Sequence, residues 1–150
     1  YLHLEGQLQL AATVSIQLPP GWSRIATGLD PVPGRANTFS APDFDTLYDC
    51  PLLIGNQETL GFNVQGKKHS VAIEGIPASV DRPRMVADLK KIVESSATLM
   101  GDLPYTHYAF LMMGSGNGGI EHANSSANSF NGNSLADENG YRRWLSFICH

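Results

Sequence analysis

The sequence predicts an α+β chain in which an all-β, sandwich-like first part precedes a part that mixes helices and strands. Three patterns lead to this prediction: apolar and polar residues alternate near the amino terminus, a hairpin pattern covers residues 60–73, and one long helix pattern follows. We place the boundary between Gly75 and Arg84. The predicted domains are therefore residues 1–80 and residues 81–150.

The strands of the first part are predicted from a period of two. Over residues 2–18 nearly every even position is apolar, which predicts one or two strands with one face against a core. The Pro-Pro-Gly of residues 19–21 ends the pattern, because proline lacks the ladder donor and glycine favours a turn. Residues 60–64 and 69–73 flank Gln-Gly-Lys-Lys, and this arrangement predicts a hairpin.

The helix of the second part is predicted from its start signals, period and stop signal. Asp81 offers an N-cap, Pro83 suits the first turn, apolar residues recur every three or four positions, and Gly101 supplies the stop. Because these signals agree along the whole segment, we predict an amphipathic helix between Asp81 and Gly101.

Two strands and a helical tail are predicted after this helix. The strands are expected at residues 105–113 and around residues 120–124. Residues 124–139 are rich in Asn, Ser and Gly, which favours a surface loop. The apolar residues of the tail recur at helical spacing; they are Tyr141, Trp144, Leu145 and Ile148.

Composition excludes several functional classes. Hydrophobic residues make up 42% of the chain, which suffices for a buried core, and the net charge of −4 with scattered basic residues provides no electrostatic footprint for nucleic acid. No apolar run approaches the roughly 20 residues needed to span a bilayer, so no membrane partner is expected. For Cys50 and Cys149, two unpaired and mostly buried thiols are favoured over a disulfide.

Four segments in consistent order resemble a known family. They are Pro20-Gly21-Trp22, Asp45-Thr46-Leu47-Tyr48-Asp49 with Pro51-Leu52-Leu53-Ile54-Gly55, Leu99-Met100-Gly101-Asp102-Leu103-Pro104-Tyr105, and Gly118-Gly119-Ile120-Glu121-His122-Ala123-Asn124-Ser125. Together they resemble the glycyl aminopeptidase family of zinc metallopeptidases, which are thermolysin-like gluzincins. The resemblance implies an N-terminal β domain, the truncated start of a thermolysin-like catalytic domain, and a PDZ-type C-terminal module elsewhere in the protein.

The resemblance also implies that His150 is the first zinc ligand. Residues 141–150 are similar to the approach to a His-Glu-x-x-His helix, whose general-base Glu, second His and downstream carboxylate ligand would follow His150. Histidines at i and i+4 share one helix face, so both imidazoles bind one ion while the Glu activates water. One imidazole alone cannot form this site, so the chain by itself is expected to be inactive. Without the resemblance, a plain terminal histidine is the favoured interpretation of His150, because a lone His carries almost no metal signal.

Substrate binding is expected at the Gly-Gly-Ile-Glu-His segment. A carboxylate binds a free α-ammonium through charge-assisted hydrogen bonds, and an extended backbone beside it pairs with a peptide as an added strand. By resemblance we assign Glu121 to the substrate amine, and Gly118 and Gly119 to the substrate backbone. His122 belongs to the same predicted substrate-binding set.

These expectations define two functional hypotheses. The first is a zinc-dependent aminopeptidase that removes N-terminal residues, small ones such as Gly or Ala by resemblance, from peptides with a free N-terminus. The alternative is a non-catalytic β-sandwich binding module or a degenerate peptidase homologue without the metal. Bacterial relatives are often exported, which favours a periplasmic or secreted location over a cytoplasmic one.

Overall fold

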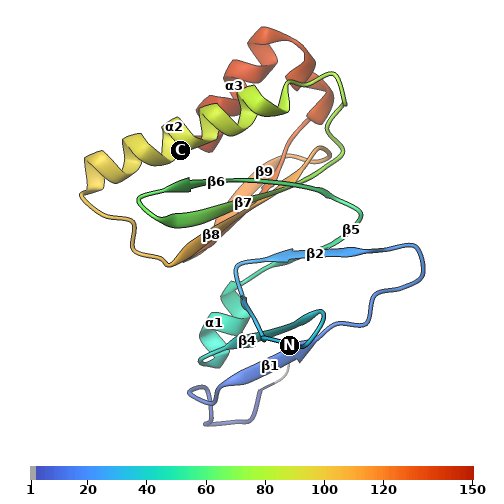
Figure 1. Ribbon diagram of the computed structural model, residues 1–150, viewed down its shortest axis with the longest axis vertical. Coiled ribbons are helices and arrows are strands. Elements are labelled where there is room, and N and C mark those ends of the chain that lie inside the picture. The colour runs from blue at the N-terminus through green and yellow to red at the C-terminus, as the bar shows by residue number, and fades with distance from the viewer. Residues whose placement is uncertain (1–2) are drawn as a thin grey trace.

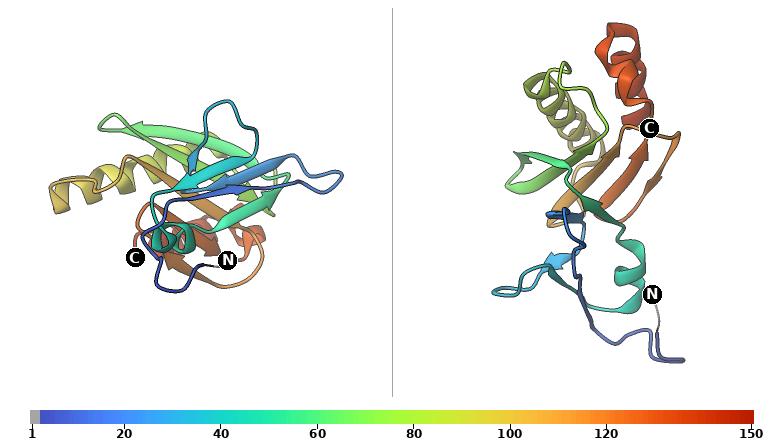
Figure 2. Two further views of the ribbon diagram at one scale, coloured as in Figure 1. Left: turned by 90° about the horizontal axis from the view of Figure 1, so that it is seen from below. Right: turned by 90° about the vertical axis from the view of Figure 1, so that its right-hand side faces the viewer.

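A five-stranded sheet forms the middle layer of the molecule, between a layer of helices and the N-terminal group. The computed structural model describes residues 3–150, and this part of the chain forms a three-stranded, a two-stranded and a five-stranded sheet. Two long helices lie over one face of the five-stranded sheet, and the two smaller sheets lie against its other face (Figures 1 and 2).

The elements fall into two groups along the chain. The first group comprises β1 (Ala12–Ser15), β2 (Arg24–Thr27), β3 (Asp30–Pro31), β4 (Thr38–Ala41), α1 (Phe44–Asp49) and β5 (Leu52–Gly55). The second group comprises β6 (Glu58–Val64), β7 (Lys67–Glu74), α2 (Arg82–Met100), β8 (His107–Met113), β9 (Gly118–Glu121), β10 (Ser125–Ser129), the 3₁₀ helix η1 (Gly132–Ala136) and α3 (Glu138–Ile148). The strand orders are β1-β4-β3, β2-β5 and β6-β7-β8-β10-β9.

The N-terminal group is less regular than the predicted sandwich. Its two sheets are short, and a small core of Leu29, Ala41, Leu47 and Cys50 lies beneath α1. The predicted alternation holds only where β1 pairs with β4, because residues 3–11 turn back on themselves through backbone hydrogen bonds within the segment. Leu4, Leu8 and Leu10 are consequently exposed, and Leu2 lies outside the described residues.

The predicted hairpin at residues 60–73 is confirmed as β6 and β7. Gln65 and Gly66 form its two-residue turn with φ of 50° and 76°, the left-handed values that suit a tight hairpin. β7 then pairs in parallel with β8, so the hairpin belongs to the same sheet as the later strands. The change of sheet therefore lies between β5 and β6, whereas the sequence predicts the boundary between Gly75 and Arg84.

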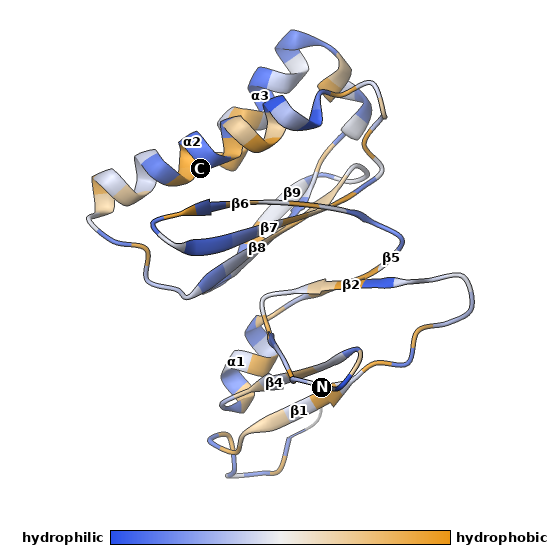
Figure 3. Ribbon diagram, viewed as in Figure 1, coloured by the Kyte–Doolittle hydropathy of each residue, from blue (hydrophilic) through white to orange (hydrophobic). Residues whose placement is uncertain are grey.

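The predicted helix is confirmed as α2, which connects the parallel strands β7 and β8. Asp81 accepts a hydrogen bond from the Arg84 amide at 2.9 Å, and Gly101 ends the helix with φ of 87°. Hydrophobic and hydrophilic stretches alternate along α2 in Figure 3, as expected for a helix with one face on a sheet. Within residues 3–150 no helix is both long enough and apolar enough to cross a membrane.

The main core lies between the five-stranded sheet and helices α2 and α3. Its buried side chains include Met85 and Leu89 of α2, Val71 of β7, Met112 of β8 and Trp144 of α3. The predicted stripe of the tail is confirmed, because Tyr141 and Trp144 are buried and Leu145 and Ile148 pack against this core. Burial of this apolar face is what holds both helices on the sheet.

The predicted loop at residues 124–139 is wrong. Its first part is β10, a strand between β8 and β9, and a later part is η1. The Asn, Ser and Gly residues of this segment have low strand propensity, so the strand is not evident from the sequence. The N-terminal group lies close to the start of this strand: a Cβ on Gly28 would collide with Asn124 and lie 3.2 Å from the Ser125 hydroxyl.

Packing on α2 predicts a large difference between two leucines of the same helix. Leu89 is fully buried and Leu99 is 85% exposed. Leu89→Ala should lower the free energy of unfolding by about 2 to 5 kcal/mol, because it removes buried methyl groups and leaves a cavity. Leu99→Ala is the matched control and should change it by less than about 0.5 kcal/mol in urea denaturation. Equal effects of the two substitutions would contradict this packing.

Candidate functional site

The predicted substrate-binding segment forms the edge of the large sheet. β9 pairs only with β10, in antiparallel orientation, and all four of its residues are exposed. The other side of β9 carries no strand among residues 3–150. A free strand edge presents unpaired backbone donors and acceptors that a further extended chain can use.

The pairing register identifies which backbone groups are free. The His122 amide donates to the Ser125 carbonyl at 2.8 Å, and these residues lie opposite each other next to the ladder. Bonded and non-bonded pairs alternate in an antiparallel ladder, so Ile120 and Gly118 bond inward to β10. The N–H and C=O groups of Gly119 and Glu121 therefore point away from the sheet.

The Glu121 side chain lies on the face of the sheet that carries α3. A Cβ on Gly119 would lie 3.1 Å from Cζ of Phe147 in α3, so this face of β9 meets the helix. Side chains two residues apart in a strand share a face, which places the Glu121 carboxylate on the same side as Gly119. Glu121 and the end of α3 therefore lie on one face of the sheet.

Tyr108 of β8 is a neighbour of both Glu121 and α3. Burial raises the pKa of Tyr108, hydrogen bonding with Ser126 opposes this shift, and the negative charge of Glu121 raises the pKa further. Tyr108 also lines a cavity of about 430 Å³ together with Ile148, the last residue of α3. Tyr108 is thus affected by the charge of Glu121 and shares a cavity with the C-terminal end of α3.

His122 points to the opposite face and contacts the N-terminal group. Its Nδ1 lies 3.0 Å from the Asp49 carboxylate, which also accepts a hydrogen bond from the Ala123 amide at 3.0 Å. The Ala123 amide, followed by the His122 ring, lowers the pKa of Asp49. The His122 side chain is only 16% exposed. This geometry fits a role in fastening β9 to α1 better than direct contact with substrate.

The sequence offered no clear signal for this contact. Asp49 lies in a different layer from His122, and neither the period of a strand nor that of a helix links them. Next to Asp49, the Cys50 thiol is buried and donates to the Asn124 amide oxygen at 3.5 Å. Burial raises the pKa of Cys50 to about 11, so this thiol is structural. Cys149 is also free but exposed, so the predicted burial holds only for Cys50.

His150 lies directly after α3 and is exposed. Its amide donates to the Phe147 carbonyl at 3.3 Å, so it continues the last turn of the helix. Phe147 is the residue that approaches Gly119, which places His150 within one turn of the contact with β9. His150 thus follows the turn of α3 that meets β9.

Residues 3–150 do not by themselves supply a zinc site. No group of three or more His, Cys, Asp or Glu side chains is arranged to hold a metal ion in the described part of the chain. A catalytic zinc needs three protein ligands and one open position. His150 is the single candidate ligand of the predicted set in this chain, and one imidazole does not fit a zinc ion alone.

The Asp49 contact predicts a pH-dependent contribution to stability. The folded pKa of Asp49 is lowered, so its stabilisation is present above the unfolded pKa of about 3.9 and is lost as the pH falls through the folded pKa. Asp49→Asn should therefore destabilise by about 1 kcal/mol or less at neutral pH, because the carboxylate is partly exposed. The difference in unfolding free energy between the wild type and Asp49→Asn, measured by urea denaturation, should be smaller at pH ~3 than at neutral pH.

Asp45→Asn in the same helix is the matched control and should change stability little at either pH. A cost of Asp49→Asn that grows on acidification would contradict the fastening role of Asp49.

Comparison with known proteins identifies a family match for the N-terminal part of the chain. Residues 1–56 match the Peptidase M61 N-terminal domain family, and their end coincides with the change of sheet after β5. No curated protein gives a significant sequence match.

Two solved structures share the fold of the chain. The aminopeptidase N family protein from Idiomarina loihiensis is 34% identical with a TM-score of 0.86, and the match covers 97% of this chain and 27% of that protein. An M1 zinc metallopeptidase from Deinococcus radiodurans is 17% identical with a TM-score of 0.54, and the match covers 92% of this chain and 32% of that one. The chain thus spans about a quarter to a third of these relatives, has their fold over that part, and is related to a family of peptidases through its N-terminal domain.

Proposed function

We propose that this chain supplies the substrate-binding edge of a zinc-dependent aminopeptidase. The observation that carries the proposal is the exposed edge of β9, which presents the free backbone groups of Gly119 and Glu121 and meets Phe147 of α3 at Gly119. The sequence similarity to peptidase families supports the reaction class. Cleavage of small N-terminal residues such as Gly or Ala is part of the proposal.

The free edge of β9 binds the peptide backbone as an additional strand. Outward N–H and C=O groups of Gly119 and Glu121 pair with the substrate main chain, which gives affinity without reading its sequence. Gly118 supports this role, because nothing lies within 4 Å of the position where its Cβ would be. A substrate backbone therefore approaches this end of the strand without steric hindrance.

Glu121 fixes the substrate by its free amine. A carboxylate forms strong charge-assisted hydrogen bonds to an ammonium group, and an acetylated terminus has no such charge. Because Glu121 is the last residue of β9, it marks the end of the pairing edge at which the substrate begins. His122, held by Asp49, fixes the position of this strand end.

His150 is proposed as one zinc ligand, and the remaining ligands and the general base come from other parts of the protein. When bound, zinc lowers the pKa of its water toward neutrality and polarises a carbonyl oxygen. The residues of this chain bind and orient the peptide, and the chain alone is expected to be inactive. The His150 amide bonds to the carbonyl of Phe147, which approaches Gly119 of β9, and this proximity to β9 supports the assignment.

Removal of the Glu121 charge tests the amine contact. In the protein that carries this chain, Glu121→Gln should raise KM for unblocked peptides by about tenfold to a hundredfold, the value of a charge-assisted hydrogen bond. Glu74→Gln, an exposed glutamate at the end of β7, is the control and should leave KM unchanged. Steady-state kinetics with free and N-acetylated peptides provide the measurement. Equal turnover of the free and the N-acetylated peptide by the wild-type protein would refute the contact between Glu121 and the substrate amine.

Zinc content tests the role of His150 separately from substrate binding. His150→Ala should lower the zinc bound per molecule after dialysis, measured by elemental mass spectrometry, because a lost imidazole ligand weakens the site. His3→Ala, an exposed histidine in the N-terminal group, is the control and should keep the zinc content of the wild type. Unchanged zinc in His150→Ala would remove His150 from the ligand set.

A further inference from the structure

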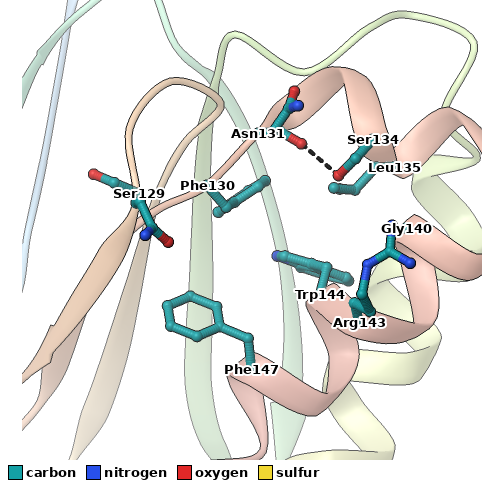
Figure 4. Close-up of a pocket in the computed structure, with 10 residues that line it drawn as sticks. Ser129, Phe130, Asn131, Ser134, Leu135, Gly140, Arg143, Trp144 and Phe147 are labelled. Atoms are coloured by element: carbon teal, nitrogen blue, oxygen red, sulfur yellow. Dashed lines mark hydrogen bonds between the residues drawn. The ribbon is translucent and has the colours of Figure 1, made fainter.

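A second cavity lies away from the Glu121 end of β9. Its volume is about 270 Å³, and it is formed where the chain after β10 and the helix η1 meet the first two turns of α3 (Figure 4). The residues that line it are Asn117, Ser129, Phe130, Asn131, Ser134, Leu135, Gly140, Arg143, Trp144 and Phe147. Neither the predicted ligand His150 nor the predicted amine contact Glu121 belongs to it.

Trp144 brings an unpartnered hydrogen-bond donor to this cavity. The side chain is 3% exposed, and its indole Nε1 has no hydrogen-bond partner among residues 3–150. Figure 4 shows the nitrogen end of the indole directed toward the space between Phe130 and Phe147. A buried N–H without an acceptor costs free energy, and native structures rarely retain one without a reason.

The residues that line the cavity indicate which kind of ligand it would bind. Phe130, Trp144 and Phe147 provide aromatic surface, and Arg143 is the one residue with a formal charge among those that line the cavity. No ion pair of Arg143 with another of the described residues is present. A hydrogen-bond acceptor satisfies the indole, a negative charge complements the guanidinium, and an apolar body fits the rings.

We infer that this cavity binds a carboxylate group attached to a small apolar or aromatic body. The carboxylate accepts the Trp144 indole hydrogen bond, and the positive charge of Arg143, which also lines the cavity, attracts it. The carboxylate belongs either to a free acid or to the C-terminus of a short peptide. This site is independent of the amine contact at Glu121, and a ligand without a free amine occupies it.

Nuclear magnetic resonance of the tryptophan side chains tests this inference. The Trp144 indole signal is identified as the one that Trp144→Phe removes. Titration with 3-phenylpropionate should shift this signal, and the Trp22 signal should stay in place, because Trp22 is not among the residues that line the cavity. The neutral 3-phenylpropionamide should bind at least about tenfold more weakly, since a hydrogen bond to a charged group is lost.

Two arginine variants and one acetylated peptide complete the experiment. Arg143→Gln should weaken binding about tenfold. Arg142→Gln removes the same charge from the neighbouring exposed residue, which pairs with Glu138, and should retain the affinity. N-acetyl-Gly-Phe binding as tightly as 3-phenylpropionate identifies a peptide C-terminus as a source, and its failure restricts the site to free acids.

Two results would overturn the inference. One is an indole signal that stays unchanged throughout the 3-phenylpropionate titration. The other is equal binding of acid and amide by the wild-type protein. Both comparisons use the unmodified protein, and where Trp144→Phe fails to fold, Trp22→Phe identifies the Trp144 signal as the one of the two indole signals of this chain that remains. Because acetylated and amine-free ligands do not use Glu121, failure here leaves the aminopeptidase proposal intact.

Discussion

The parallel pairing of β10 with β8 is the constraint on which the rest of the structure depends. Ser125 to Ser129 pair with Ala109 to Met113 on one side and with β9 on the other, so β9 becomes the last strand of the sheet. Without β10 the glycine-rich segment would have no partner and no defined register. The pairing therefore decides which backbone groups of Gly119 and Glu121 are free, and on which face Glu121 lies.

Close approach of the layers explains the composition of this region. Gly28 contacts Asn124, which donates from its amide to the Gly28 carbonyl at 2.6 Å, and His107 donates to the same carbonyl at 2.9 Å. On the other face, Gly119 leaves room for Phe147 of α3. Small residues in β9 and β10 thus allow both the N-terminal group and α3 to pack tightly around the proposed substrate-binding edge.

Sequence reasoning predicted those elements whose signals are local. The hairpin at Gln65-Gly66 and the helix between Asp81 and Gly101 follow from turn and cap chemistry that acts within a few residues. It missed β10, whose Ser125, Ser126 and Asn128 are buried because the strand pairs in parallel with β8, a strand that is not adjacent to it in sequence. The Gly-Gly-Ile-Glu-His segment was found through family resemblance, whereas the fastening by Asp49 and the Trp144 cavity depend on tertiary contacts with no pattern in the chain.

Hydrogen exchange at the sheet edge is the most direct measurement of the central claim, that β9 binds a peptide N-terminus along its free side. The amides of Gly119 and Glu121 exchange freely in the unliganded protein and should become protected when a slowly cleaved peptide with a free amine is added. The inward amides of Gly118 and Ile120 should not change, and the N-acetylated peptide should give little protection. Protection at Gly118 and Ile120 instead, or none at the four positions, would contradict the claim.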